Sequence, residues 1–186
     1  LLLSIYRVRW LMGGGVLLLA LFFALPSDFK ERLYSSFDPN DTTTRIRIEL
    51  LRTGKNIITA HPWTGLGPRM VPRLYGNYNG TDEFPSWIYQ HLHNNLVHIA
   101  AEMGIITLVV WLALWIRLFR DFARFARLRN SDSLSRCVAI NAIGVLAAFL
   151  LAGLLEYNFG DSEILILLLF FITIPYVVHR EQEKAA

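Results

Sequence analysis

The chain has 186 residues, a formal net charge of +3 and 54% hydrophobic residues, with a mean hydropathy of +0.38. Soluble domains carry about 45–50% apolar residues, so this composition excludes an ordinary soluble protein and indicates a membrane protein. The basic residues lie beside apolar runs, where membrane topology accounts for them without nucleic acid as a partner. The single cysteine, Cys137, excludes an internal disulfide and a thiolate metal site.

Apolar runs in the sequence predict about four membrane-spanning helices. They cover residues 8–25, 94–118, 137–155 and 163–179, with a mixed polar segment at 26–92 and a basic segment at 119–136. Because arginine and lysine accumulate on the cytoplasmic side, we expect the basic segment to be cytoplasmic and residues 26–92 to form a large, partly helical periplasmic loop. The sequence therefore predicts an all-α, polytopic transmembrane helical bundle.

We expect residues 1–186 to form a single membrane domain. The chain begins Leu1-Leu2-Leu3, and its first apolar run follows arginines rather than opening a signal peptide. This start is typical of the C-terminal part of a longer polytopic protein.

The polar loop contains a predicted helix over residues 44–60, which Pro62 ends. Arg47 falls in the middle of its apolar face. At 100° per residue that face also holds Leu50, Leu51, Gly54, Ile57 and Ile58, whereas Arg45, Glu49, Arg52 and Asn56 lie opposite. An arginine in this position either reaches the lipid headgroups or binds an anion, because its planar guanidinium fits two phosphate oxygens. Arg45 lies close enough along the helix to assist.

After this helix, the string from His61 to Pro68 predicts a turn, in which Gly65 and Gly67 allow another stretch of backbone to approach closely. His61 precedes a proline, and we interpret it as a turn residue rather than a base.

Three of the five histidines follow, at the start of the second predicted span. His93 lies at the helix N-terminus, where the helix dipole favours the neutral imidazole that a general base requires. Asn94 either caps the helix or orients a substrate. His98 and Glu102 are one helical turn apart on another face, where they form either a hydrogen-bonded pair or, less favoured, two metal ligands.

The spacing of these residues resembles that of a known family. The matching positions are His93-Asn94, then nine residues to Gly104 and two more to Thr107, with Arg47, Leu51, His61-Pro62, Gly65 and Gly67 upstream. This pattern resembles bacterial O-antigen ligases, and O-antigen polymerases and related glycan transferases share it in looser form. Leu51 stands where the family usually has tryptophan. The resemblance covers the chain from about Ile5 to Val178.

The resemblance implies a membrane glycosyltransferase that moves a glycan from undecaprenyl diphosphate to a sugar hydroxyl of lipid A-core, with inversion at the anomeric carbon. It implies His93 as the catalytic histidine and Arg47 as the arginine that binds the diphosphate, with no metal and no cofactor. Arg45, Asn94, His98 and Glu102 are candidate substrate-binding residues. The expected partners are the polyprenyl-diphosphate glycan donor, the lipid A-core or another glycan acceptor, and membrane lipid.

Other activities remain open at this point. Within the family, an O-antigen polymerase or a protein O-oligosaccharyltransferase would use the same residues, and the fit to the histidine motif favours the ligase. A lipid-glycan transporter would use Arg47 and the histidines only for binding. Such proteins place ionisable residues and helix breaks at the middle of the membrane, whereas here Glu102 is the main ionisable residue within a span.

Overall fold

The computed structural model describes residues 41–80, 90–128 and 132–185. The chain divides into two compact units, Leu1–Arg45 and Ile46–Ala186, and the second unit holds nearly all of the described residues. The elements are the helices α3 (Thr42–Ala60), α4 (Val71–Leu74), α5 (Asn95–Arg127), α6 (Ser133–Ala152) and α7 (Ser162–Ala185), with short 3-10 turns η1 (Tyr75–Asn77) and η3 (Asn158–Gly160). No strand occurs in these residues, so the predicted all-helical class is confirmed for the described part of the chain.

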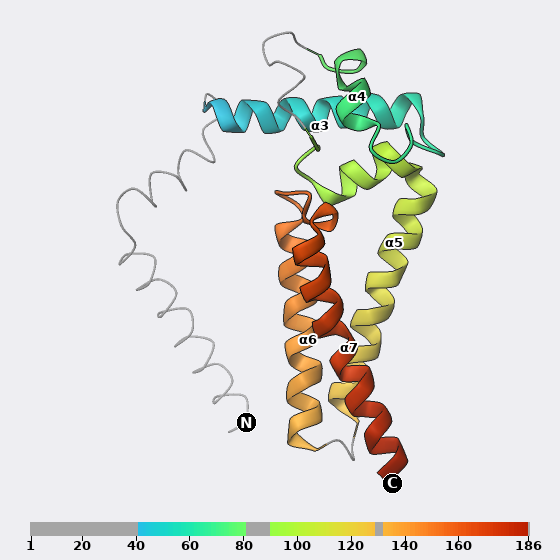
Figure 1. Ribbon diagram of the computed structural model, residues 1–186, viewed down its shortest axis with the longest axis vertical. Helices are drawn as coiled ribbons and strands as arrows, with labels where there is room; N and C mark the ends of the chain where they lie inside the picture. The colour runs from blue at the N-terminus through green and yellow to red at the C-terminus, as the bar shows by residue number, and fades with distance from the viewer. Residues whose placement is uncertain (1–40, 81–89, 129–131, 186) are drawn as a thin grey trace, which may run out of the picture. The chain divides into compact units, whose positions relative to one another are not determined.

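Three of the described helices, α5, α6 and α7, are long and apolar enough to cross a membrane. They run side by side along the long axis of the molecule (Figure 1). Their shared core includes Trp111, Trp115, Phe122, Leu146 and Phe149. Large apolar side chains also cover their outer surface, as expected where lipid replaces water as the solvent. The first predicted span, residues 8–25, lies outside the described residues.

A second, smaller core lies at the end of the bundle where α5 begins. It joins α3, α4 and the first turns of α5 through Leu50, Ile57, Val71, Tyr75, Leu92 and Ala101. Figure 1 shows α3 running across this end of the bundle. Gly54 lets α3 come close to α5, because a Cβ at that position would meet the side chain of Val97.

The buried face of α3 differs from the predicted one. It consists of Glu49, Leu50, Thr53, Gly54 and Ile57, whereas Leu51 is exposed and Arg47 is half-buried. Glu49 is buried because its Oε1 accepts a hydrogen bond from the backbone N–H of Gly80 at 2.6 Å. Because this backbone partner holds Glu49 inside, the buried face of α3 includes Glu49, and Arg47 lies at the edge of that face.

We predicted an unbroken span over residues 94–118, but α5 is broken at Gly104, where φ is 81° and ψ is 168°. The part after the break, from Ile105 to Arg127, is about 35 Å long at 1.5 Å per residue, which is enough for the roughly 30 Å hydrocarbon layer. The part before the break runs at an angle to it (Figure 1). The histidine-bearing turns are therefore separated from the long apolar segment.

The turn at residues 62–67 supplies hydrogen-bond partners for the backbone groups that this break leaves without helical partners. A continuous helix would pair the N–H of Ile105 with the carbonyl of Ala101. Here the carbonyl of Pro62 accepts from Ile105 at 2.8 Å, and the N–H of Leu66 donates to Ala101 at 2.9 Å. The N–H of Gly67 donates in the same way to the carbonyl of Glu102, at 2.8 Å.

The contact is between two stretches of backbone. A Cβ at Gly104 would lie 2.0 Å from the carbonyl oxygen of Trp63, and a Cβ at Gly65 would lie 2.3 Å from the carbonyl carbon of Glu102. We call this contact between residues 62–67 and 101–105 the backbone crossing. It fixes the loop against the start of α5, as the glycines of the turn predicted.

Candidate functional site

His93 lies immediately before α5, in a conformation set by the helix cap that follows it. Asn94 is the N-cap, and its side chain accepts a hydrogen bond from the backbone N–H of Val97 at 3.0 Å. His93 itself has a φ of 46°, which is uncommon for a residue with a side chain. Asn94 therefore has the capping geometry that the sequence offered as one of its two roles.

Two asparagines tie this helix start to the turn between α6 and α7. The backbone N–H of Asn95 donates to the carbonyl of Gly153 at 2.7 Å, and its buried side chain bonds to the Asn158 side chain and to the N–H of Phe159. The side chain of Asn94 donates to the carbonyl of Leu154 at 2.9 Å. These contacts hold residues 153–159 beside His93.

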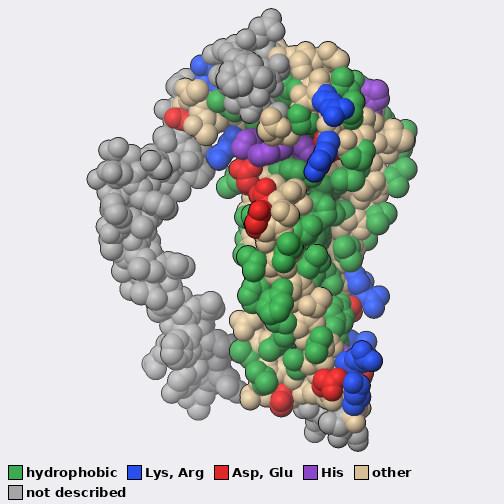
Figure 2. All heavy atoms as spheres, in the orientation of Figure 1, with side chains coloured by type: hydrophobic (Ala, Val, Ile, Leu, Met, Phe, Trp, Pro, Cys, Tyr) green, Lys and Arg blue, Asp and Glu red, His purple; other side chains and the backbone are tan. Residues whose placement is uncertain are grey.

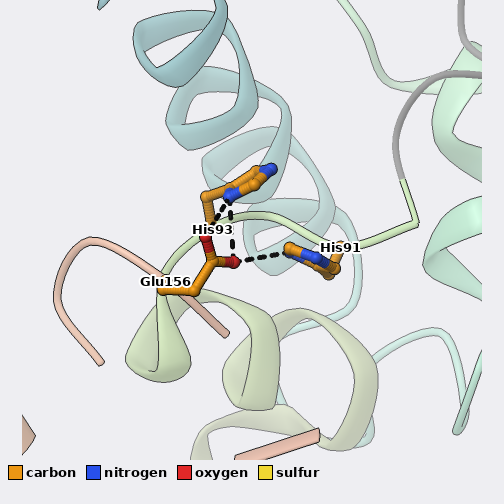
Figure 3. Close-up of side chains that lie close together, drawn as sticks. All are labelled: His91, His93 and Glu156. Atoms are coloured by element: carbon orange, nitrogen blue, oxygen red, sulfur yellow. Dashed lines mark hydrogen bonds and ion pairs between the residues drawn. The ribbon is translucent and has the colours of Figure 1, made fainter. Parts of the chain in front are cut away.

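The turn carries Glu156, whose carboxylate meets two of the histidines (Figure 3). Nδ1 of His93 lies 2.9 Å from each oxygen of this carboxylate, and Nδ1 of His91 lies 3.4 Å from Oε1. The two imidazole ring centres are 4.3 Å apart. We call these three residues the His91–His93–Glu156 cluster.

The hydrogen bond to Glu156 determines where the His93 proton lies. The N–H of Tyr157 and the bond from His93 lower the pKa of the Glu156 carboxyl, and they outweigh the effect of burial, which raises it. An ionised carboxylate can only accept, so Nδ1 of a neutral His93 carries the proton and donates it. Nε2 then keeps its lone pair, which is the arrangement of a general base held by a carboxylate.

His91 completes the cluster in a more enclosed setting. Burial, followed by the nearby His93, lowers its pKa, so that its imidazole is neutral near pH 7. Within the described part of the chain, no hydrogen bond reaches its buried Nδ1 atom. His91 therefore faces the carboxylate of Glu156 with its buried Nδ1 atom, 3.4 Å from Oε1.

His98 and Glu102 form the buried pair that their spacing predicted. Nε2 of His98 lies 3.5 Å from Oε2 of Glu102, and its Nδ1 accepts from the backbone N–H of Leu92 at 3.3 Å. The other oxygen of Glu102 accepts from the N–H of Val71 at 3.3 Å. The ring of Tyr157 stacks on His98 with centres 3.7 Å apart, and burial raises the pKa of the Tyr157 hydroxyl. This pair links α4, α5 and the turn at Tyr157.

A pocket of about 430 Å³ opens beside these residues. Its lining combines His91 of the cluster and the His98–Glu102 pair with residues of the loop and of the following turn: Arg69, Pro72, Arg73, Gln90, His91, His98, Glu102, Tyr157, Gly160 and Asp161. In Figure 2, histidine side chains gather at one end of the apolar surface, with basic and acidic side chains beside them. The pocket thus offers two guanidinium groups next to a histidine and carboxylate cluster.

The predicted site residues fall in different places. His98 and Glu102 line the pocket, His93 contacts Glu156 beside it, and Asn94 caps α5. Arg47 is half-buried on α3 and is not among the described residues that line the pocket. Arg45 is exposed on the same helix, and His61 contacts the hydroxyl of Tyr78 at 2.8 Å, as a loop residue would.

Sequence reasoning missed Glu156 as the partner of His93, and Arg69 and Arg73 as the basic residues of the pocket. Glu156 lies between the third and fourth predicted spans, and its pairing with His93 joins residues 63 positions apart. A signal for Arg69 was available, because it directly follows Gly67-Pro68 in the turn. Its φ of 61° belongs to the same sharp change of direction.

Comparison with known families identifies the family to which the chain belongs. The sequence pattern that defines the O-antigen ligase family matches residues 1–112, which is more than half of the chain. The chain belongs to the O-antigen ligase family. Members are membrane glycosyltransferase-type enzymes, so the resemblance based on the histidine motif is confirmed at the level of the family. Comparison with curated proteins gives no match.

The region matched by the family contains only part of the site. The region common to O-antigen ligases contains α3, both sides of the backbone crossing, and the start of α5 with His91, His93 and His98. Glu156 and Tyr157 lie beyond it, on the turn that the two asparagines hold in place. The carboxylate side of the cluster is therefore supplied by the part of this O-antigen ligase family protein that follows the matched region.

Proposed function

We propose that this protein is an O-antigen ligase, which transfers a glycan from undecaprenyl diphosphate to a hydroxyl of lipid A-core at the periplasmic face of the bacterial inner membrane. His93 is the general base, and Glu156 positions it. The observation that supports this most directly is the 2.9 Å contact between Nδ1 of His93 and Glu156, which leaves Nε2 free to accept the acceptor's proton.

The other half of the reaction is departure of the diphosphate, which develops negative charge. Arginines stabilise such charge without a metal. We propose Arg47 for this role from the family pattern, and Arg69 and Arg73 as further contacts from the pocket. Arg45, Asn94, His98 and Glu102 remain proposed substrate-binding residues, with membrane lipid as a further partner and no cofactor.

The sidedness of the site follows from charge. α5 ends with Arg120, Arg124 and Arg127, at the opposite end from the histidines. The positive-inside rule places that basic end in the cytoplasm, and the cluster then faces the periplasm.

Transfer by the purified protein is the first test. The substrates are a polyprenyl-diphosphate glycan and lipid A-core, and a chelator is present. A single chelator-resistant conjugate supports the ligase. A ladder of products on the polyprenyl carrier indicates the polymerase, a glycosylated peptide acceptor indicates the protein O-oligosaccharyltransferase, and donor binding without any product indicates a transporter.

The roles of the cluster are tested by His93→Ala and Glu156→Gln, with Glu163→Gln as the matched control on an exposed carboxylate. We expect His93→Ala to lower kcat by roughly 10²–10⁴-fold, the usual contribution of a general base. Glu156→Gln should lower kcat and leave the KM for the donor nearly unchanged, because it disturbs the tautomer of His93 rather than binding. Wild-type kcat in either variant would refute the assigned role.

The arginines are tested by donor binding. Arg47→Ala and Arg69→Ala should both weaken binding of the polyprenyl diphosphate, whereas Arg120→Ala, at the other end of α5, should not. If folded Arg47→Ala protein kept wild-type turnover and affinity, the diphosphate role would move to the pocket arginines alone.

A further inference from the structure

The His91–His93–Glu156 cluster has the composition and spacing of a metal site. Each residue offers one ligand atom, a ring nitrogen from each histidine and a carboxylate oxygen from Glu156, and these atoms all lie within 4.8 Å of one another. They come from two segments, the stretch before α5 and the turn after α6, which the asparagines lock together. Figure 3 shows the three side chains converging on one point.

The distances fit a tetrahedral ion. Zinc binds imidazole nitrogen and carboxylate oxygen at about 2.0–2.2 Å, so neighbouring ligands of a tetrahedron stand about 3.3–3.6 Å apart. The distance from Nδ1 of His91 to Oε1 of Glu156, 3.4 Å, falls within this range, and the distance from Nδ1 of His93 to the same oxygen, 2.9 Å, is shorter. Binding an ion would therefore move the side chains of His93 and Glu156 apart by about 0.4–0.7 Å.

The surroundings leave room for a fourth ligand. The side chains of His91, His93 and Glu156 are 31%, 33% and 44% exposed. Nδ1 of His91 is itself buried, so water would reach the remaining position from the side of His93 and Glu156. Two imidazoles and one carboxylate favour zinc over magnesium or calcium, which prefer oxygen ligands.

We propose that His91, His93 and Glu156 bind a divalent ion of the zinc type, and that its binding inhibits glycan transfer. The inhibitory part rests on the proposed function, in which His93 is the base, whereas the binding part does not.

The inhibition follows from where His93 carries its single proton. Without metal, Nδ1 donates to Glu156 and the lone pair is on Nε2. A metal ion bound to Nδ1 uses the electron pair of that nitrogen. The single proton of the neutral imidazole must then be on Nε2. The nitrogen that would accept the hydroxyl proton becomes a donor, and the same ion removes Glu156 as its orienting partner. Zinc therefore changes the tautomer of the base without blocking the pocket.

The binding test uses the purified protein, zinc chloride and a fluorescent chelator as competitor. Wild type should bind one more zinc ion than His91→Ala and Glu156→Gln do, or bind it at least tenfold more tightly. The matched control is His179→Ala, which removes a histidine that lies 3.5 Å from Glu183 near the other end of α7. Equal zinc binding by wild type and both cluster variants would overturn the proposal.

The activity test compares each protein with itself, with and without zinc. Wild-type transfer should fall at least tenfold when the site is filled and return when a chelator is added, and magnesium chloride should have no effect. His91→Ala should lose this sensitivity at the same zinc concentration, whereas His179→Ala should keep it. Binding without inhibition, or stimulation by zinc, would refute the inhibitory role. Absence of transfer without zinc would instead count against the proposed function and leave the binding result standing.

Discussion

The substitution Gly104→Ala should damage the fold at the backbone crossing, because two separate costs meet there. The first is conformational: φ of 81° with ψ of 168° is a region used almost only by glycine, and another residue pays about 1–3 kcal/mol. The second is steric, because the new Cβ would lie 2.0 Å from the carbonyl oxygen of Trp63 and 2.7 Å from the nitrogen of Thr64. Both are backbone atoms, so the turn itself must move.

Moving the turn breaks hydrogen bonds. An ordinary Cβ contact begins near 3.4 Å, so the turn must retreat by about 1.4 Å, which is enough to lose the bonds of Ile105 and Gly67. Each such bond contributes about 0.5–1.5 kcal/mol. Adding the conformational cost gives a local destabilisation on the order of 2–6 kcal/mol.

Hydrogen exchange followed by mass spectrometry measures this effect where it occurs. The amides of residues 65–67 and 104–106 should exchange at least tenfold faster in Gly104→Ala, since each 1.4 kcal/mol changes an opening equilibrium about tenfold. Gly144→Ala is the matched control: it lies within α6, nothing would lie within 4 Å of its Cβ, and alanine favours a helix. The same exchange pattern in both variants would refute the reasoning.

Three further substitutions should lower the stability of the protein by different amounts, according to the hydrogen-bond partners that each one leaves unpaired. Thermal unfolding in the same detergent measures this ranking. Asn95→Ala removes a buried side chain that joins α5 to the following turn, and should cost about 2–4 kcal/mol. Glu49→Ala leaves the N–H of Gly80 without its acceptor, and should cost about 1–2 kcal/mol. Tyr176→Phe loses an exposed bond to Asp121 and should change stability by less than about 0.5 kcal/mol. A midpoint temperature of unfolding for Tyr176→Phe below that of Asn95→Ala would contradict this ranking.

Local patterns in the sequence predicted the parts of this fold that local physics decides. The apolar runs predicted α5, α6 and α7 because each run is longer than a buried helix needs. Asparagine is common at helix N-caps, which predicted a capping role for Asn94. The spacing of His98 and Glu102 placed both residues on one helical face. The glycines around Pro62 predicted a close backbone approach, although their partner could not be named.

The remainder depended on contacts between distant segments. Glu156 meets His93 because Asn95 fixes the turn after α6, and neither residue shows this in its own neighbourhood. Glu49 looked like part of a solvated face, yet a loop amide 31 residues away draws it inside. The break at Gly104 was hidden by a run of good helix formers, because the hydrogen bonds that compensate it come from the preceding loop.

The backbone crossing also bears on what a match to this family means. Gly65, Gly67 and Gly104 contribute contacts of the main chain, and none of them offers a side chain to a substrate. The side chains that line the neighbouring pocket, among them Arg69, Arg73 and Tyr157, could differ while those three glycines stay in place. The glycine spacing is thus a signature of how the loop is docked, and substrate preference is to be sought in the side chains that surround the docked loop.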